Sequence, residues 1–124
     1  MITIDGTSYD IPVLSMTRRA DFLDKYAERT EDGVLHRELI GVYFNYQVKF
    51  GRSNDTAVYA ALWNKLTEPE EFHSVTVPDE SGDFEMTFQA YFSNVTDEIR
   101  RVTPEAAFFK NLTVNFTAKS PART

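Results

Sequence analysis

Alternation of apolar and polar residues is strongest between Gly41 and Gly51, where the chain reads GVYFNYQVKFG. Successive side chains of a strand point to opposite faces, so this pattern predicts a β-strand with one face in a core. The core face comprises Val42, Phe44, Tyr46, Val48 and Phe50, and the opposite face comprises Tyr43, Asn45, Gln47 and Lys49. We expect the opposite face to meet solvent or a partner.

Alternation of the same kind predicts further strands on both sides of this segment. They cover residues 2–4, 9–16, 72–77, 84–92 and 112–118, and the aromatic strand itself extends over residues 34–50 with a bend or bulge at Gly41. Asp5-Gly6 and residues 79–82 have the composition of turns. Residues 94–107 are polar and include Pro104, so we interpret them as a connection, and we expect the C-terminal SPART to be loose or to lie on a partner.

One segment has helical rather than strand periodicity. Val58, Leu62 and Leu66 recur at intervals of four residues, which places them on one side of a helix. The triplet Ser-Asn-Asp that precedes them is suited to capping a helix, and Pro69 lies just beyond the last of them. The pattern predicts a helix over about residues 55–67.

Residues 17–33 have the most unusual composition of the chain. They hold five acids and four bases, with only scattered apolar residues among them. A solvated arm or long hairpin fits this composition, and a short helix with Phe22, Leu23 and Tyr26 on one side is the alternative. Asp32-Gly33 has the composition of a turn that leads into the next strand.

The composition fits one folded domain. A chain of 124 residues is long enough for a single core, and a 14% share of aromatic residues means that the core is built largely from rings. The predicted elements describe a mainly β fold over residues 1–124, as a small antiparallel β-barrel or sandwich. The helix at about 55–67 is inserted in its middle, and the arm or hairpin at about 17–33 extends from it.

Charge and targeting signals narrow the classes of partner. The formal net charge is −6, and binding to nucleic-acid phosphates relies on clustered bases, so we expect no specific nucleic-acid binding. The doubled bases Arg18-Arg19 and Arg100-Arg101 are interpreted as a solvated face or as intersubunit salt bridges with acidic neighbours. The N-terminus lacks signal-peptide character and no apolar run approaches about 18 residues, so we expect no membrane association.

The sequence offers little for catalysis. No cysteine is present, and neither a G-x-S-x-G nucleophile motif nor a glycine-rich phosphate loop occurs. His36 and His73 each lie in a predicted strand without a partner at ligand spacing, so we assign them structural or surface roles. Tyr59 and Trp63 on the helix are interpreted as core anchors rather than a ligand stack. We therefore expect no enzymatic activity, no cofactor and no metal site.

The order of elements resembles that of small tail proteins encoded by phages and prophages of Gram-positive bacteria. The resemblance rests on ITIDGTSYDIPV, LIGVYFNYQVKFG, YAALWNKLTEP, VTVPD, FEMTFQAYFSNV and FFKNLTVNFTAKSPAR, which together span nearly the whole chain. Each of these is a turn or packing signature. The final W-x-G-L motif of such proteins is represented by Phe109-Lys110-Asn111-Leu112, so its Trp and Gly are replaced.

The resemblance implies a virion structural protein of a tail or baseplate, made in the cytoplasm of a bacterial host. Tail-tube, tail-completion and distal-tail proteins assemble as rings, commonly sixfold, through sheet edges and long loops, and they contact other tail proteins. An acidic lumen would repel DNA. The assembly interface is then expected in the arm and on the polar strand face, at Arg18, Arg19, Asp21, Phe22, Lys25, Tyr26, Arg29, Tyr43, Asn45, Gln47 and Lys49.

Two other functions fit the same sequence. A head-to-tail connector or adaptor component differs from a tail protein mainly in its place within the particle. A small ligand-binding β-barrel would be a monomer with an apolar cavity, although the aromatic strands carry enough rings to fill a small barrel.

Overall fold

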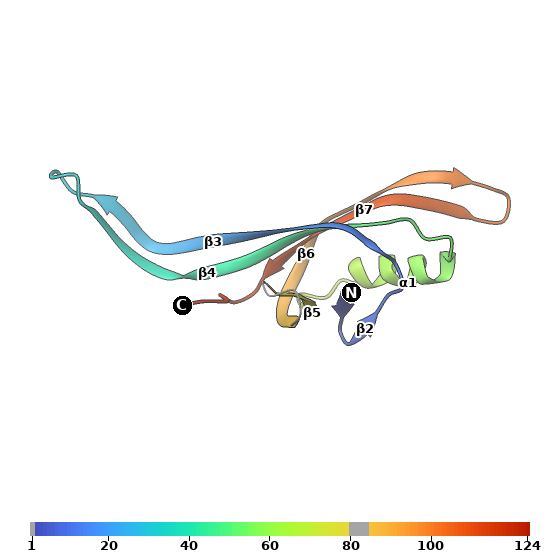
Figure 1. The fold of residues 1–124 in the computed structure, drawn as a ribbon, viewed down its shortest axis with the longest axis horizontal. Helices are drawn as coiled ribbons and strands as arrows, with labels where there is room; N and C mark the ends of the chain where they lie inside the picture. Colours follow the sequence, from blue (N-terminus) through green and yellow to red (C-terminus); the bar gives the residue numbers. More distant parts are fainter. Residues whose placement is uncertain (1, 80–84) are drawn as a thin grey trace.

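A computed structural model describes residues 2–79 and 85–124 and shows a mainly β chain with one helix (Figure 1). The strands are β1 (Thr3–Ile4), β2 (Thr7–Ser8), β3 (Val13–Arg29), β4 (Leu35–Phe50), β5 (His73–Pro78), β6 (Glu85–Val102) and β7 (Ala107–Ala118), and the helix is α1 (Thr56–Leu66). The predicted β class with one inserted helix is confirmed. Phe84 and most of the predicted turn at 79–82 lie outside the described residues.

All seven strands belong to one antiparallel sheet with the order β2-β1-β5-β6-β7-β4-β3. The terminal strands β2 and β3 do not pair with each other, so the sheet is open, and of the two predicted arrangements, a barrel or a sandwich, the barrel is wrong. Closure requires the last strand to pair with the first. Here β2 has only two residues, whereas the 17-residue β3 extends away from the body with β4 (Figure 1).

The core forms where the sheet folds back on itself. The first part of β6 pairs with β5 and the remainder pairs with β7. β5 and the first part of β6 lie below β4 and β7 (Figure 1), and Phe88 of β6 stacks on Tyr46 of β4 with ring centroids 5.5 Å apart. The predicted alternation in β4, β5 and β7 is confirmed, because Val48, Val75 and Val114 are all fully buried in this core.

The helix covers the end of the core. Asp55 caps its N-terminus by accepting hydrogen bonds from the backbone N–H groups of Ala57 and Val58, at 3.1 and 3.2 Å. Tyr59, Leu62 and Leu66 are buried on its inner side, so the predicted positions Leu62 and Leu66 are confirmed, whereas Val58 is only half-buried and Tyr59 takes the inner position in the first turn.

The interpretation of residues 94–107 as a connection is wrong, because β6 continues to Val102 and β7 begins at Ala107. Their pairing is irregular, with register shifts between Ser93 and Arg101. Asn94 has a φ of 55°, in the left-handed region that Asn tolerates better than most residues. These irregularities, together with an exposed Ile99, remove the simple alternation by which a strand is recognised.

Residues 17–33 belong to a long hairpin, so the short-helix alternative is wrong. β3 begins directly after Pro12, which shortens the strand predicted at 9–16, and it pairs with β4 from Val13↔Phe50 to Arg29↔Leu35. The pairing steps from Leu23↔Gly41 to Asp24↔Leu39, which confirms an irregularity at Gly41.

The C-terminal tail is bound to the body rather than loose. Val42 donates its N–H to the carbonyl oxygen of Arg123 at 2.8 Å, and Ala122 donates to the carbonyl oxygen of Val42 at 2.9 Å. The tail passes so close to Gly41 that a Cβ atom there would lie 2.6 Å from the Cβ atom of Pro121. Glycine at position 41 therefore makes room for the tail.

We expect Gly41→Val to detach the tail and to lower the free energy of unfolding by about 1–3 kcal/mol, the usual cost of an overpacked site. Faster amide hydrogen exchange at Val42, Ala122 and Arg123 would report the detachment. The control is a chain that ends at Ser120, in which Gly41→Val should cost much less. An equal cost in both backgrounds would show that the tail is not what the valine displaces.

Candidate assembly surfaces

The hairpin β3–β4 extends from the body as a two-stranded ribbon (Figure 1). Pairing of β4 with β7 ends at Tyr46↔Phe116, and the tail covers Val42. From Asp24↔Leu39 to the tip, beyond the tail contact at Gly41, each strand pairs only with the other within the described chain. Isolated two-stranded hairpins are marginally stable in water, so this ribbon lacks the support that other elements receive.

The ribbon exposes more apolar surface than a solvated arm needs. Seven large apolar side chains on it are between 42% and 59% exposed: Phe22, Leu23, Tyr26, Val34, Leu35, Leu39 and Ile40. Contiguous exposed apolar surface marks interaction sites more often than scattered single residues do. The ribbon is therefore the strongest candidate for a contact with another chain.

The charges of the ribbon are only partly neutralised within it. Arg37 pairs with Asp24 at 2.6 Å, and Lys25 lies 4.0 Å from Glu38. Nearer the tip, Arg29 donates to the carbonyl oxygen of Gly33 at 2.7 Å. Residues 24–40 hold five acids and three bases, a net charge of −2 with His36 neutral, and Glu28 and Glu31 have no ion-pair partner in the described part of the chain. The tip is acidic.

All eleven predicted interface residues lie on this hairpin, but on two different faces. Pairing places Arg19 opposite Asn45, and Thr17 opposite Gln47, on the face turned away from the core. Arg18 is on the other face, where its guanidinium lies 5.6 Å from the ring centroid of Phe44. The residues nearer the tip are Phe22, Lys25, Tyr26 and Arg29, and those nearer the body are Asp21, Tyr43 and Lys49. Their role in assembly stays a prediction.

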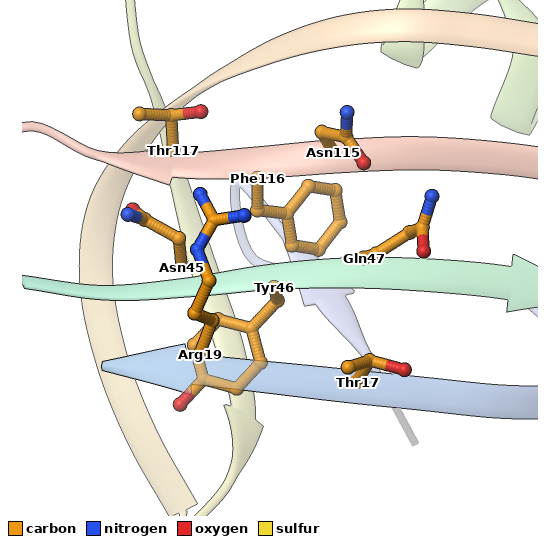
Figure 2. A pocket seen from close by; sticks show the side chains of 8 residues that line it. All are labelled: Thr17, Arg19, Asn45, Tyr46, Gln47, Asn115, Phe116 and Thr117. Atoms are coloured by element: carbon orange, nitrogen blue, oxygen red, sulfur yellow. The ribbon is translucent and has the colours of Figure 1, made fainter. Parts of the chain in front are cut away.

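A shallow polar pocket of about 230 Å³ opens on the outer face of β3, β4 and β7 (Figure 2). Its rim consists of Thr17, Arg19, Asn45, Gln47, Asn115 and Thr117, above the rings of Tyr46 and Phe116. Figure 2 shows Arg19 reaching from β3 across β4 toward β7. The pocket unites three predicted interface residues with two on β7 that the sequence did not indicate.

Asn45 has a structural role at this pocket. Its side-chain oxygen accepts a hydrogen bond from the backbone N–H of Ala118 at 2.8 Å, where the β4–β7 ladder ends. Its amide nitrogen donates to Asp21 at 2.5 Å, and Arg19 also donates to that carboxylate, at 2.9 Å. Hydrogen bonds from Arg19 and Asn45 lower the pKa of Asp21. Asn45 thus fastens the end of β7 to the base of the hairpin.

A second hairpin, β6–β7, extends in the opposite direction and lies over α1 (Figure 1). Tyr59 stacks on Phe109 with ring centroids 5.5 Å apart and donates its hydroxyl hydrogen to Asp97 at 2.7 Å. Burial, followed by the Asp97 interaction, raises the pKa of Tyr59, so the phenol stays protonated at ordinary pH. The Tyr59 hydrogen bond thus holds the second hairpin on the helix.

Between α1 and this hairpin lies a mainly apolar groove of about 400 Å³, named here the α1 groove. It is lined by Ser53, Thr56, Tyr59, Ala60, Trp63, Asn64, Asp97, Ala107, Phe108 and Phe109. Tyr59 is a buried core anchor as predicted, whereas Trp63 is only half-buried and lines the groove. The sequence did not indicate the groove, because its two walls are about 40 residues apart in the chain.

The cluster that most resembles a metal site consists of Asp5, Glu68 and His73. Lys65 already pairs with both of its carboxylates, because its ammonium lies 3.5 Å from Asp5 and 3.0 Å from Glu68. Asp5 accepts from Nδ1 of the buried His73 at 2.7 Å and from the backbone N–H of Ser74 at 2.9 Å. These contacts tie the β1–β2 turn to β5 and to the end of α1, which gives His73 the structural role that the sequence predicts.

We expect Asp5→Asn to lower stability by about 1–3 kcal/mol at neutral pH, since it weakens the bond to the buried His73. Asn tolerates the φ of 50° at this position, so the change tests the charge rather than the backbone. Burial by itself would raise the pKa of Asp5. The hydrogen bonds from His73 and Ser74 have the opposite and larger combined effect, so the pKa lies below its ordinary 3.8.

The stability that ionised Asp5 contributes is therefore complete above pH 3.8 and is lost as the pH falls through its lower pKa in the folded state. Urea unfolding across the acid range should give a smaller loss of stability for Asp5→Asn than for the wild type. Parallel curves for the two proteins would contradict this account of Asp5.

None of the helices within residues 2–79 and 85–124 is long and apolar enough to span a membrane. No protein-family model, curated protein or solved structure matches the chain.

Proposed function

We propose that this chain is a non-enzymatic structural subunit that assembles with copies of itself through the β3–β4 hairpin and its sheet edges. The observation that carries the proposal is a hairpin with strands of 17 and 16 residues, whose outer part no other described strand pairs with and which exposes seven large apolar side chains. A chain that worked alone would have to keep this apolar surface in water. Packing it against a neighbouring copy would bury it and support the ribbon.

The edge of the sheet provides the second support. β3 is a terminal strand of 17 residues, and nothing in the described chain pairs with its outer side. Monomeric proteins commonly shorten or protect such edges, because an open edge is a template for another strand. Arg18, Arg19 and Lys25 provide charge on β3 that opposes indiscriminate pairing, yet the strand is long and continuous enough to accept a specific partner.

For the biological setting, we propose a tail or baseplate protein of a phage or prophage, located in the virion and made in the host cytoplasm. This part rests on the resemblance of the element order to small tail proteins of Gram-positive phages. A head-to-tail contact between subunits that closes would give a ring, possibly a hexamer, and contacts with other tail proteins would extend it. A head-to-tail connector or adaptor component is the nearest alternative.

The α1 groove favours a second candidate function, the binding of a small apolar ligand. At about 400 Å³, with aromatic walls, the groove falls in the size range of ligand sites. This function predicts a monomer whose ligand affinity does not depend on the β3–β4 hairpin. Assembly is the stronger proposal, because ligand binding leaves the apolar ribbon without a role.

Light scattering across a concentration series tests the proposal directly. We expect a mass that grows to a ring or longer polymer as the protein concentration rises. A strict monomer at every concentration would overturn self-assembly and favour the ligand-binding alternative.

A further inference from the structure

We propose that the α1 groove of one copy receives the tip of the β3–β4 hairpin from a second copy. This inference rests on the proposed self-assembly and names the surface that receives the hairpin. The two surfaces are complementary in their apolar character and in their charge.

The α1 groove has aromatic walls, and two arginines lie beside one of them. Trp63 is half-buried in one wall, and Phe108 forms part of the other. The guanidinium groups of Arg100 and Arg101 lie 5.4 and 4.5 Å from the ring centroid of Phe108. No ion pair of either arginine is found among the described residues, and Arg100 donates instead to the amide oxygen of Asn54 at 3.0 Å.

The hairpin tip presents the opposite charge beside apolar side chains. Glu28 and Glu31 lie next to the tip, and their carboxylates have no ion-pair partner in the parts of the chain described. Val34, just before the returning strand, and Leu35, the first residue of β4, are each 50% exposed. A tip of this chemistry can place its aliphatic side chains in the groove while its carboxylates meet Arg100 and Arg101, and such pairing gives specificity as well as affinity.

The contact must join two copies, because the hairpin extends away from the body on the side opposite to the α1 groove (Figure 1). One copy therefore offers a tip at one end and a groove at the other. Such a heterologous contact repeats from subunit to subunit, and it yields a closed ring or an open filament according to the rotation between neighbours. Of the two interpretations of Arg100-Arg101, a solvated face or intersubunit salt bridges, this contact favours the salt bridges.

Disulfide cross-linking between two single-cysteine proteins tests this contact, and the natural chain contains no cysteine that would interfere. Glu31→Cys places a thiol at the tip, and Ala60→Cys places one in the α1 groove. Ala61→Cys is the matched control, because Ala61 is also exposed on α1 but lies about 100° further round the helix and does not line the groove. Each variant is oxidised alone and in equimolar mixtures.

We expect the mixture of Glu31→Cys and Ala60→Cys to give a cross-linked heterodimer at least about tenfold more abundant than the mixture with Ala61→Cys. Equal yields from the two mixtures would overturn the proposal. If wild-type protein assembles and neither mixture cross-links, the groove is not the receiving surface, although self-assembly stands. A wild-type protein that remains monomeric at every concentration would overturn both.

Charge exchange provides an independent test on the same surfaces. The pair of substitutions Glu28→Arg and Glu31→Arg should raise the concentration needed for assembly by about tenfold, since two attractions become repulsions. Adding Arg100→Glu and Arg101→Glu in the same chain should restore assembly. Glu70→Arg with Glu71→Arg is the control for net charge, because both residues lie outside the tip and the groove. If the chain with all four substitutions does not regain assembly, direct pairing between the tip carboxylates and the two arginines is contradicted.

Discussion

A chain in which Leu23 is joined to Gly41 by Asn-Gly, in place of residues 24–40, should stay folded and lose all self-assembly. Leu23 and Gly41 lie opposite each other in the β3–β4 ladder, so a short turn can join them. Asn-Gly is a favoured two-residue hairpin turn. Every hydrogen bond and ion pair described for residues 24–40 stays within the hairpin. The body therefore loses no described contact of this kind with the removed segment.

Size-exclusion chromatography with light scattering would measure the loss of assembly, and circular dichroism with urea unfolding would measure the fold. The matched control keeps the full hairpin and carries Leu35→Thr and Leu39→Thr, which remove exposed apolar surface but retain high strand propensity. We expect this control to assemble far less than the wild type. A shortened chain that unfolds would show that the hairpin is part of the core structure, and one that still assembles would show that another surface joins the subunits.

Strands with one buried face could be predicted from the sequence. In β4, the apolar residues that alternate from Val42 to Phe50 face the core, and β5 and β7 follow the same rule. The helix could be predicted because its signals are local, namely the spacing of Leu62 and Leu66 and the cap at Asp55. In each of these elements the apolar residues recur with the period of the secondary structure, because only one side of the element is buried.

Strands with two exposed faces could not be predicted in the same way. In the outer part of the β3–β4 hairpin neither face is buried, and the outer part of the β6–β7 hairpin is only partly covered, by α1 on one side, so apolar residues such as Leu23 and Ile99 follow no simple alternation. Bulges add to the difficulty, because each one reverses the phase of the pattern. This is why the composition of residues 17–33 predicts an arm or long hairpin and still allows a short helix, and why residues 94–107 have the appearance of a connection.

Contacts between distant residues are the other part that the sequence does not reveal. Asp5 meets His73 across 68 residues, and Tyr59 meets Asp97 across 38. Neither pair has a characteristic local spacing. The α1 groove, with its two neighbouring arginines, likewise forms only because β6–β7 turns back over the helix. The candidate receiving surface could therefore be identified only in the structure, whereas the residues of the β3–β4 hairpin could be named from the sequence.

The largest loss of stability is expected at Phe116, whose side chain is fully buried at the centre of the sheet. Pairing places it beside Tyr46 on β4 and beside Phe92 on β6, and its ring lies 4.9 Å from that of Phe92. We expect Phe116→Ala to lower the free energy of unfolding by about 3–5 kcal/mol, because it removes apolar contacts and leaves a cavity that strands on both sides cannot easily fill.

Phe22→Ala is the matched control, because it removes the same ring from a position that is 59% exposed on the hairpin. We expect its cost in the monomer to be within about 1 kcal/mol, while its effect on assembly exceeds that of Phe116→Ala at concentrations where both chains are folded. Urea unfolding at a concentration where the wild type is monomeric separates the two quantities, since assembly would otherwise add to the apparent stability. Equal stability losses at the two positions would mean that Phe22 is packed within its own chain, which would contradict a hairpin kept available for a neighbour.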